Sequence, residues 1–311
     1  MKRILITGAN GYIGSYLIEN FNKQDVEIIP LVRKLPPYYE YWRENYEIIE
    51  CDITELDQLR EKIKDINYII HLAAFNDVLT KIYPDKALII NGIGTRNILE
   101  IAKELECEFF IYFSTLQVYG KELEGIISIE SSINTHNDYA LTHYVAEQYC
   151  RMYCSNFNMN VAILRPSNVF GAPMSVHVSR WSLVPACFCK SVYETNKIVL
   201  KSSGKQMRDF IDLDYILKSV EFLIKTYEKG LKIYNITSES IFSINEITKL
   251  VQSVAKSELN KNIELIYESG IPLESNKFKA LNNLLGPVDE KIIEKKIIKE
   301  ITKIFKLLKN S

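Results

Sequence analysis

Residues 3–14 read RILITGANGYIG, a short apolar run followed directly by three glycines and the start of a helical pattern. A glycine turn between a strand and a helix lets the backbone approach a pyrophosphate closely. The helix N-terminus then supplies N–H groups and partial positive charge for that anion. Gly8, Gly11 and Gly14 have this spacing at the end of the apolar run. The stretch predicts a dinucleotide-binding turn after the first strand of a parallel sheet.

Short apolar runs alternate with helical patterns over the first two-thirds of the chain, which is typical of a parallel sheet covered by helices. Helices are expected at residues 13–22, 87–104 and 139–157. After the first strand, further strands are expected at residues 26–32, 46–52, 67–74, 109–115, 160–166 and 232–237. We therefore expect an α/β fold, a Rossmann-type doubly wound parallel sheet with a smaller, mainly helical C-terminal substrate-binding cap.

The domain boundaries follow from where this rhythm changes. Residues 1–167 are expected to form the dinucleotide-binding domain, to which residues 208–236 return. The cap is expected to comprise residues 168–207 and 237–311. Near the end, residues 289–310 alternate charged residues with Ile and Leu, which indicates an amphipathic surface helix.

Composition narrows the class of protein. The 311 residues contain 38 Lys and Arg against 39 Asp and Glu, a balance that does not indicate a nucleic-acid or membrane partner. The six cysteines form no C-x-x-C pair and the chain has four histidines, so no metal site is expected. Because the sequence has neither a signal-peptide pattern nor a membrane-length apolar run, we expect a cytoplasmic protein.

Nine motifs in order resemble the extended short-chain dehydrogenase/reductases, the group of nucleotide-sugar epimerases, dehydratases and reductases. The likeness runs from Lys2 to about Asn235. The motifs are TGANGYIG (7–14), CDITE (51–55), HLAA (71–74), NGIGTRNILE (91–100), FSTLQVYG (113–120), YALTH (139–143), LRPSNVFG (164–171), RDFIDLDY (208–215) and YNITSES (234–240).

The resemblance implies roles for particular residues. Thr115 and Tyr139 would be the catalytic hydroxyls, and Asn168 and Arg208 would bind the diphosphate of a nucleotide-sugar substrate. Thr115 and Gln117 would also contact the substrate. A guanidinium suits a phosphate, although a surface Arg208 paired to Asp209 or Asp212 is the other interpretation. Asn91 would brace the sheet edge. The remaining residues implied to bind the cofactor are Gly8, Gly11, Tyr12, Ile13, Gly14, Asp52, Ile53, Leu72, Ala73 and Ala74.

The choice between NADP(H) and NAD(H) depends on the end of the second strand. A carboxylate there would bind the 2′-hydroxyl of NAD, whereas a basic residue favours the 2′-phosphate of NADP. Val32 stands about where the acid would fall, followed by Arg33 and Lys34. We therefore expect NADP(H) to be favoured, with NAD(H) and a merely solvated basic turn as the alternatives.

One residue departs from the family pattern of Tyr-x-x-x-Lys, because Tyr139 is followed four positions later by His143. Helical spacing still puts both side chains on one face. In the family the lysine bonds the nicotinamide ribose and its charge lowers the tyrosine pKa. A histidine can donate the same hydrogen bond, but it is fully charged only below its own pKa, near 6.5 if unperturbed.

The substitution favours one direction of reaction. A tyrosine that begins by oxidising an alcohol must act as a base, whereas one that protonates the oxygen of a reduced ketone can begin neutral. We therefore expect an NADPH-dependent reductase of a nucleotide-linked 4-ketosugar. A 4-epimerase with tightly bound NAD is the alternative, and a noncatalytic nucleotide-binding protein is a third reading.

Other members of the group fit less well. A dehydratase of this family would carry Asp and Glu after the threonine, where this chain has Leu116 and Gln117. Enzymes that reduce and also epimerise would need a cysteine near Leu116 and a histidine near Ser182. His177 is out of register for that role.

A homodimer is expected, because in the family the helices at 87–104 and 139–157 pair two subunits. Apolar and aromatic residues extend beyond one face of these segments, including Tyr144, Tyr149, Met152 and Tyr153. Packing within one subunit would explain the same stripe.

Overall fold

Two units make up the chain in the computed structural model, which describes residues 1–178, 180–268 and 277–310. Unit 1 contains residues 1–121, 132–165 and 217–234, and unit 2 contains residues 122–131, 166–216 and the described residues after 234. Residues 122–131 and 208–216, expected with the nucleotide-binding domain, cluster with unit 2. The division into cofactor-binding and substrate-binding parts stays a prediction.

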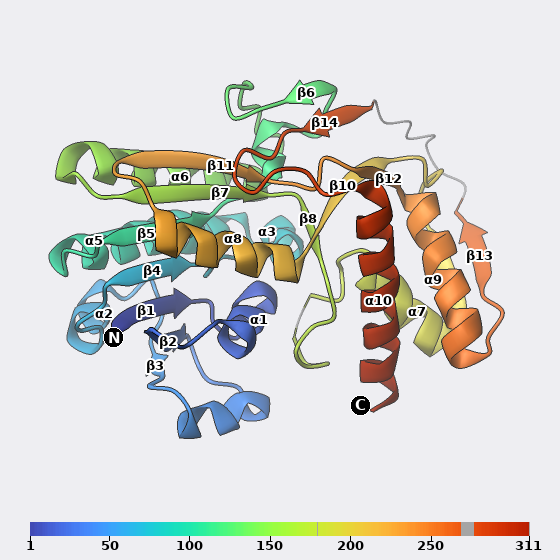
Figure 1. The fold of residues 1–311 in the computed structure, drawn as a ribbon, viewed down its shortest axis with the longest axis horizontal. Coiled ribbons are helices and arrows are strands. Elements are labelled where there is room, and N and C mark those ends of the chain that lie inside the picture. The colour runs from blue at the N-terminus through green and yellow to red at the C-terminus, as the bar shows by residue number, and fades with distance from the viewer. Residues whose placement is uncertain (179, 269–276, 311) are drawn as a thin grey trace. The chain divides into compact units, whose positions relative to one another are not determined.

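A seven-stranded sheet is the framework of unit 1, and its strand order is β11-β7-β5-β4-β1-β2-β3 (Figure 1). The described pairs from β3 to β7 are all parallel, which confirms the expected Rossmann-type sheet. β3 is much shorter than the expected strand at 46–52. The strands are β1 (Lys2–Thr7), β2 (Val26–Val32), β3 (Ile49–Glu50), β4 (Tyr68–His71), β5 (Phe109–Phe113), β7 (Val161–Pro166) and β11 (Leu231–Ile236).

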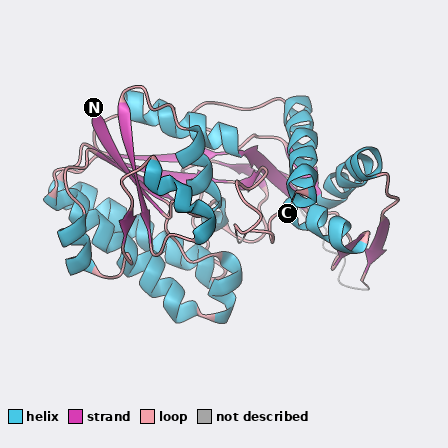
Figure 2. Cartoon of the chain, turned by 90° about the horizontal axis from the view of Figure 1, so that it is seen from below, coloured by secondary structure: helices cyan, strands magenta, loops and turns pink. Residues whose placement is uncertain are grey.

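Helices cover both faces of this sheet (Figure 2). On one face, α2, α5 and α6 bury apolar side chains against the strands, as Leu59, Ile98 and Cys150 do. Alternate strand residues such as Leu5 and Phe110 supply the other side of that core, because successive side chains of a strand face opposite ways. The unit's helices include α1 (Tyr12–Asn20), η1 (Pro37–Glu44), α2 (Leu56–Lys62), α3 (Asp77–Ile82), α5 (Thr95–Glu104), η3 (Leu116–Tyr119), α6 (Asp138–Phe157) and α8 (Leu213–Thr226).

The segment expected as one helix from Ala87 to Glu104 has three parts. It starts at the end of α4 (Pro84–Ala87), continues as the π-helical stretch η2 (Leu88–Gly94), and ends as α5. Single π-helical turns inside α-helices are frequent near functional sites. Hydrophobic periodicity does not distinguish these hydrogen-bonding patterns, so the interruption could not be predicted.

Unit 2 has its own core. Its sheets are β12-β10-β8, β13-β9 and β14-β6, and the helix α10 (Glu290–Lys309) buries one stripe of side chains that includes Ile293, Ile297 and Ile301. This confirms the amphipathic helix expected at 289–310. The other elements are β6 (Gly125–Ile127), β8 (Asn168–Phe170), α7 (Ala186–Thr195), β9 (Lys197–Leu200), β10 (Met207–Asp212), β12 (Ile241–Ser243), α9 (Ile244–Leu259), β13 (Glu264–Tyr267) and β14 (Phe278–Ala280).

Among the helices of residues 1–178, 180–268 and 277–310, none combines the length and the apolar character that a membrane crossing needs.

Candidate active site

The glycine turn between β1 and α1 packs so closely against neighbouring backbone that no side chain fits at two of its positions. Gly8 has a φ of 66°, and a Cβ there would lie 2.7 Å from the backbone nitrogen of Ala73. A Cβ on Gly14 would lie 2.3 Å from the carbonyl oxygen of Gly8. The N–H of Gly11 closes the turn by donating to the Gly8 oxygen at 2.9 Å, and α1 begins at Tyr12, next to Ile13. These residues therefore fit the pyrophosphate of a dinucleotide at a helix N-terminus.

Thr7, at the end of β1, ties this turn to the HLAA segment. Its Oγ1 accepts hydrogen bonds from the backbone N–H groups of Leu72 and Ala73, both at 3.1 Å. The same hydroxyl lies 2.7 Å from Nδ1 of His71. Ala74, the next residue, is exposed. The segment expected behind the pyrophosphate and ribose is thus bonded to the strand that carries the glycine turn.

His71 is fully buried and bonded through both ring nitrogens. Nε2 lies 2.9 Å from Oγ1 of Thr95, which itself donates to the carbonyl oxygen of Asn91 at 2.5 Å. Because Thr7 accepts two N–H bonds and Thr95 donates onward, the neutral imidazole with its proton on Nε2 satisfies every partner. Burial, with a smaller contribution from His143, lowers the pKa of His71 to about 3. This histidine is a neutral structural link.

Asn91 connects three segments. Its Oδ1 accepts from the backbone N–H of Phe75 at 2.6 Å, and its Nδ2 donates to Oγ1 of Thr142 at 2.9 Å. It stands in η2 and is almost completely buried. Asn91 therefore holds α6 against the segment after β4. Its partner on α6, Thr142, directly precedes His143.

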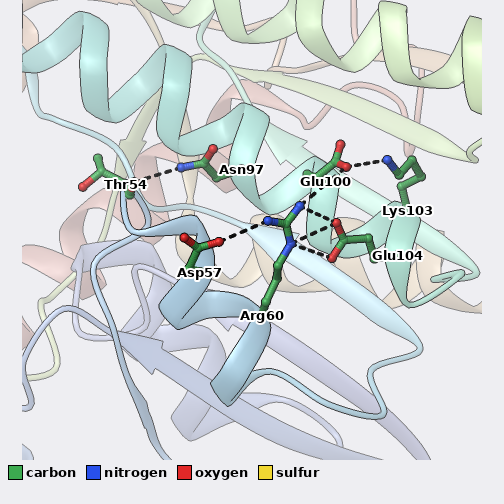
Figure 3. A network of polar contacts seen from close by, with 7 residues as sticks. All are labelled: Thr54, Asp57, Arg60, Asn97, Glu100, Lys103 and Glu104. Atoms are coloured by element: carbon green, nitrogen blue, oxygen red, sulfur yellow. Dashed lines mark hydrogen bonds and ion pairs between the residues drawn. The ribbon is translucent and has the colours of Figure 1, made fainter.

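Asp52 and Ile53, expected beside the adenine, lie in a turn after β3. Asp52 Oδ1 accepts from both the backbone N–H and the hydroxyl of Thr54, at 3.0 and 2.8 Å. Asn97 of α5 donates to the carbonyl oxygen of Ile53 at 3.0 Å. It also donates to that of Thr54 at 3.1 Å (Figure 3). Below it, Arg60 of α2 binds Glu104 of α5. The turn is therefore attached to the helix layer of unit 1.

The end of β2 carries the residues expected to select the coenzyme. Val32 is completely buried, whereas Arg33 and Lys34, which follow it, are exposed. Glu50 of β3 accepts from the backbone N–H of Leu35 at 3.2 Å, which holds the chain just after the two cations.

The three expected catalytic side chains belong to η3 and α6. Thr115 is buried and caps η3, its Oγ1 accepting from the N–H of Gln117 at 3.2 Å. The ring of Tyr139 meets the ring of His143 edge-on, with 4.6 Å between centroids. Gln117 is exposed, and its Oε1 accepts from Nδ2 of Asn137, the N-cap of α6, at 3.5 Å. The turn that carries Thr115 therefore contacts the first turn of α6.

A buried ion pair anchors the same turn. Arg165 binds both carboxylate oxygens of Glu147, and these residues are 1% and 0% exposed. Ser114 donates to Glu147 at 2.6 Å, and Nη1 of Arg165 donates to the hydroxyl of Tyr119 at 2.7 Å. The segment that carries Thr115 is thus fixed at both of its ends.

Four residues next to the expected catalytic side chains were not expected there from the sequence: Tyr112, Ser114, Glu147 and Arg165. For three of them, a pattern in the sequence could have shown the contact. Residues two apart on a strand and residues four apart on a helix are both separated by about 6–7 Å, so such pairs can face each other. Tyr112 and Ser114 therefore meet His143 and Glu147 as two successive contacts between β5 and α6.

Asn168 and Arg208 lie on neighbouring strands of unit 2. Asn168, on β8, is exposed and donates to the carbonyl oxygen of Asp209 at 2.8 Å. Arg208, on β10, is partly buried, which lowers its pKa, and it donates to the carbonyl oxygen of Met207 at 3.0 Å.

The two acids considered as partners of Arg208 bind other groups. Asp209 accepts from Ser167 at 2.5 Å and from the backbone N–H of Ser238 at 3.0 Å. Asp212 accepts from Lys296 at 2.7 Å.

Known proteins resemble the chain over most of its length. It is 28% identical over 272 residues to a protein of Methanocaldococcus jannaschii named "Putative UDP-glucose 4-epimerase", with 85% of each chain covered. It is also 28% identical to a mouse dTDP-D-glucose 4,6-dehydratase, covering 85% of this chain and 76% of the mouse protein. The structure of a UDP-glucuronic acid 4-epimerase from Bacillus cereus in complex with NAD matches with a TM-score of 0.78 and 22% identity, over 99% and 96% of the two chains.

A family model described as the NAD dependent epimerase/dehydratase family matches residues 4–237, three-quarters of the chain. That range begins in β1, contains the glycine turn and the Tyr139–His143 pair, and ends after β11. The protein belongs to the NAD-dependent epimerase/dehydratase family, whose members are nucleotide-sugar enzymes of the extended short-chain dehydrogenase/reductase type.

Proposed function

We propose that the protein is an NADPH-dependent reductase of a nucleotide-linked 4-ketosugar. The observation that carries the proposal is that His143, with Nδ1 bonded to the Tyr112 hydroxyl at 2.8 Å, stands where the family has a lysine. An imidazole bonded to a neutral phenol does not supply the permanent charge of an ammonium group. Tyr139 therefore begins the reaction as a protonated acid, which suits reduction better than oxidation.

The coenzyme would be held by unit 1. Gly8, Gly11 and Gly14 would admit its pyrophosphate at the start of α1, with Tyr12 and Ile13 following, while Leu72, Ala73 and Ala74 would lie along the ribose and Asp52 and Ile53 along the adenine. Arg33 and Lys34 would bind a 2′-phosphate, because both are exposed cations directly after a buried strand end. When bound, the reduced nicotinamide supplies a hydride to the carbonyl carbon of the sugar.

Side chains at the start of η3 and in α6 would carry out the proton transfer and position the reacting groups. Tyr139 transfers its phenolic proton to the carbonyl oxygen, which becomes the hydroxyl of the product, and Tyr139 then recovers a proton from water. Thr115 hydrogen-bonds the same oxygen, and His143 bonds the coenzyme ribose. The ketone would thus gain one hydride and one proton in all, the proton coming from Tyr139.

The substrate's diphosphate would bind Asn168 and Arg208. Both belong to neighbouring strands of unit 2, and the partners considered for Arg208 in the sequence, Asp209 and Asp212, are bonded to serines and to Lys296. Gln117 is exposed beside Thr115 and would contact the sugar.

Dehydration is a poorer fit for the same site. Leu116 is buried and apolar, and the Gln117 amide cannot exchange a proton at neutral pH, whereas that reaction needs an acid and a base after the threonine. The likeness to a 4,6-dehydratase therefore supports membership of the family and does not support dehydratase activity.

A 4-epimerase with tightly bound NAD is the second candidate. The names of the archaeal relative and of the Bacillus cereus structure favour it. Such an enzyme would oxidise and re-reduce the same carbon, so Tyr139 would first have to act as a base. A noncatalytic protein would bind coenzyme and convert no sugar.

A second copy of the chain is proposed to pack on η2 and α6. Leu88, Ile89 and Ile93 of η2 are 42–49% exposed, and Leu141 and Met152 of α6 are 46% and 40% exposed. Tyr153, by contrast, is buried within unit 1, so only part of the predicted stripe is available to a partner.

The purified protein should be tested with added NADPH and a set of nucleotide-linked 4-ketosugars, following absorbance near 340 nm. The reductase consumes one NADPH per sugar converted and shows no conversion without it. Conversion without added coenzyme, by a protein that retains NAD through purification, would assign the epimerase instead. Binding of NADPH with no conversion of any sugar would assign the noncatalytic reading.

A further inference from the structure

The ring of His143 is packed between two tyrosines. It is 3% exposed, its edge meets the ring of Tyr139, and its Nδ1 lies 2.8 Å from the hydroxyl of Tyr112. Tyr112 belongs to β5, faces α6, and is 2% exposed. His143 is therefore held from its own helix on one side and from the central sheet on the other.

The Tyr112 hydroxyl can form a hydrogen bond with His143 whether the imidazole is neutral or protonated. Burial raises the pKa of Tyr112 well above its usual value, so the group keeps one proton to donate. The hydroxyl oxygen is 2.8 Å from Nδ1 and 3.4 Å from the carbonyl oxygen of His143. Toward a neutral ring it donates to Nδ1. Toward a protonated ring it accepts from Nδ1–H and turns its own proton to the carbonyl.

The 2.8 Å contact with Nδ1 is common to both arrangements, and in the first the phenolic proton goes to the nearer acceptor, Nδ1 at 2.8 Å instead of the carbonyl oxygen at 3.4 Å. If Nδ1 accepts the phenolic proton, the ring proton of His143 must be on Nε2. His71, whose ring stacks on Tyr112 at 5.9 Å, is neutral, and Glu147, Cys150 and Tyr139 are further titratable groups close to Tyr112. In the first arrangement, Tyr112 determines which nitrogen of His143 is a donor.

We propose that Tyr112 is a positioning residue that fixes the ring of His143 with Nε2–H as its donor, and so lets a histidine replace the family's lysine. The inference rests on the proposed function, in which His143 bonds the coenzyme ribose. An ammonium group needs no such partner, because all three of its N–H groups are donors and it has no tautomers. The tyrosine on β5 and the histidine on α6 therefore form one functional pair.

Imidazole ¹⁵N spectra of the histidine-labelled protein test the tautomer without any substrate. The four histidines can be assigned by single substitutions. In the wild type at alkaline pH, His143 should show a protonated Nε2 and an Nδ1 that accepts a hydrogen bond, and Tyr112→Phe should produce a mixture of tautomers. A proton on Nδ1 in the wild type, or an unchanged His143 spectrum in Tyr112→Phe, would overturn the proposal.

A double-mutant cycle tests whether Tyr112 acts through His143. Tyr112→Phe should lower kcat roughly five- to tenfold, the effect of one hydrogen bond, with little change in KM for the sugar. In a His143→Gln background the same change should have no further effect. The matched control is Tyr153→Phe, which removes a 2.7 Å bond to Glu100 farther along the same helix and should leave kcat unchanged.

Equal losses from Tyr112→Phe in both backgrounds would contradict a role through His143. If no variant reduces any sugar, the proposed function fails, while the ¹⁵N spectra still decide whether Tyr112 sets the tautomer.

Discussion

Arg165 binds Glu147 through two parallel hydrogen bonds, with Nε 2.9 Å from Oε1 and Nη2 2.6 Å from Oε2. Both side chains are almost completely buried, one on β7 and the other on α6. The free-energy cost of burying two charges is offset only when the geometry is favourable and further hydrogen bonds are made. Here Ser114 and Tyr119 supply those bonds. The pair joins β7 to α6 and holds Ser114 and Tyr119, the residues near the two ends of the Thr115 turn.

Removing one partner of this ion pair should destabilise the fold far more than removing both. Arg165→Met leaves an uncompensated buried carboxylate and should lower the free energy of unfolding by about 3–5 kcal/mol, measured by urea denaturation. The double variant Arg165→Met, Glu147→Leu should recover a large part of that loss. Equal stability of the single variant and the wild type would contradict the ion pair as described.

Gly14→Ala should weaken coenzyme binding at least tenfold, measured by calorimetry with NADPH. Its Cβ would lie 2.3 Å from the Gly8 oxygen, so the turn must shift. Gly230→Ala is the control, because it replaces a glycine outside the turn whose φ of 81° strains an alanine but whose Cβ would meet nothing within 4 Å. It should destabilise the fold by about 1 kcal/mol and leave affinity unchanged. A folded Gly14→Ala protein with wild-type affinity would show that the turn does not hold the pyrophosphate.

Coenzyme selection should depend on the two exposed cations after β2. The double variant Arg33→Ala, Lys34→Ala should bind NADPH at least tenfold more weakly and NADH unchanged, since only NADPH carries the 2′-phosphate. Arg43→Ala is the control, because this cation is already paired with Glu40 and Glu50. Equal affinity of the wild type for the two coenzymes would refute the preference.

His71 should make the protein less stable in acid. Its folded pKa is lowered to about 3 from an ordinary 6.5, so the unfolded chain binds the proton more readily. The stability associated with the neutral ring is therefore complete above pH 6.5 and decreases as the pH falls toward 3, by up to a few kcal/mol. The free energy of unfolding, measured by denaturation at several pH values across this range, should depend less steeply on pH for His71→Asn. His177→Asn, at an exposed position, should retain the wild-type slope. Identical pH dependence in all three proteins would contradict this assignment.

The proposed self-association can be tested by light scattering. Ile89→Glu with Ile93→Glu places two charges on the exposed face of η2 and should convert a dimer to a monomer without lowering the melting temperature substantially. Ile126→Glu, on an exposed apolar side chain of β6, should leave the mass unchanged. A monomeric wild type would rule out the dimer.

The parallel sheet and the glycine turn could be predicted because their signals are local patterns. An apolar run, a turn that only glycine allows and the periods of strand and helix are all visible within a few residues. The same applies to α10, whose buried isoleucines recur at helical spacing.

The features that could not be predicted depend on contacts between distant segments. Tyr112 and His143 are 31 residues apart, and Tyr112 alone is an ordinary strand residue. The shortness of β3 and the π-helical η2 likewise reflect how neighbouring elements pack, since the sequence of each is compatible with a regular element. The substrate sugar depends on loops whose sequence has no simple chemical code.

Isotope transfer is the most direct test of ketosugar reduction. NADPH carrying deuterium at both C4 positions should be incubated with the protein and a nucleotide-linked 4-ketosugar, and the product examined by mass spectrometry and NMR. The predicted product is an alcohol with one deuterium on the former carbonyl carbon, formed together with one NADP⁺. Formation of a 4-epimer without deuterium and without consumption of NADPH would contradict it.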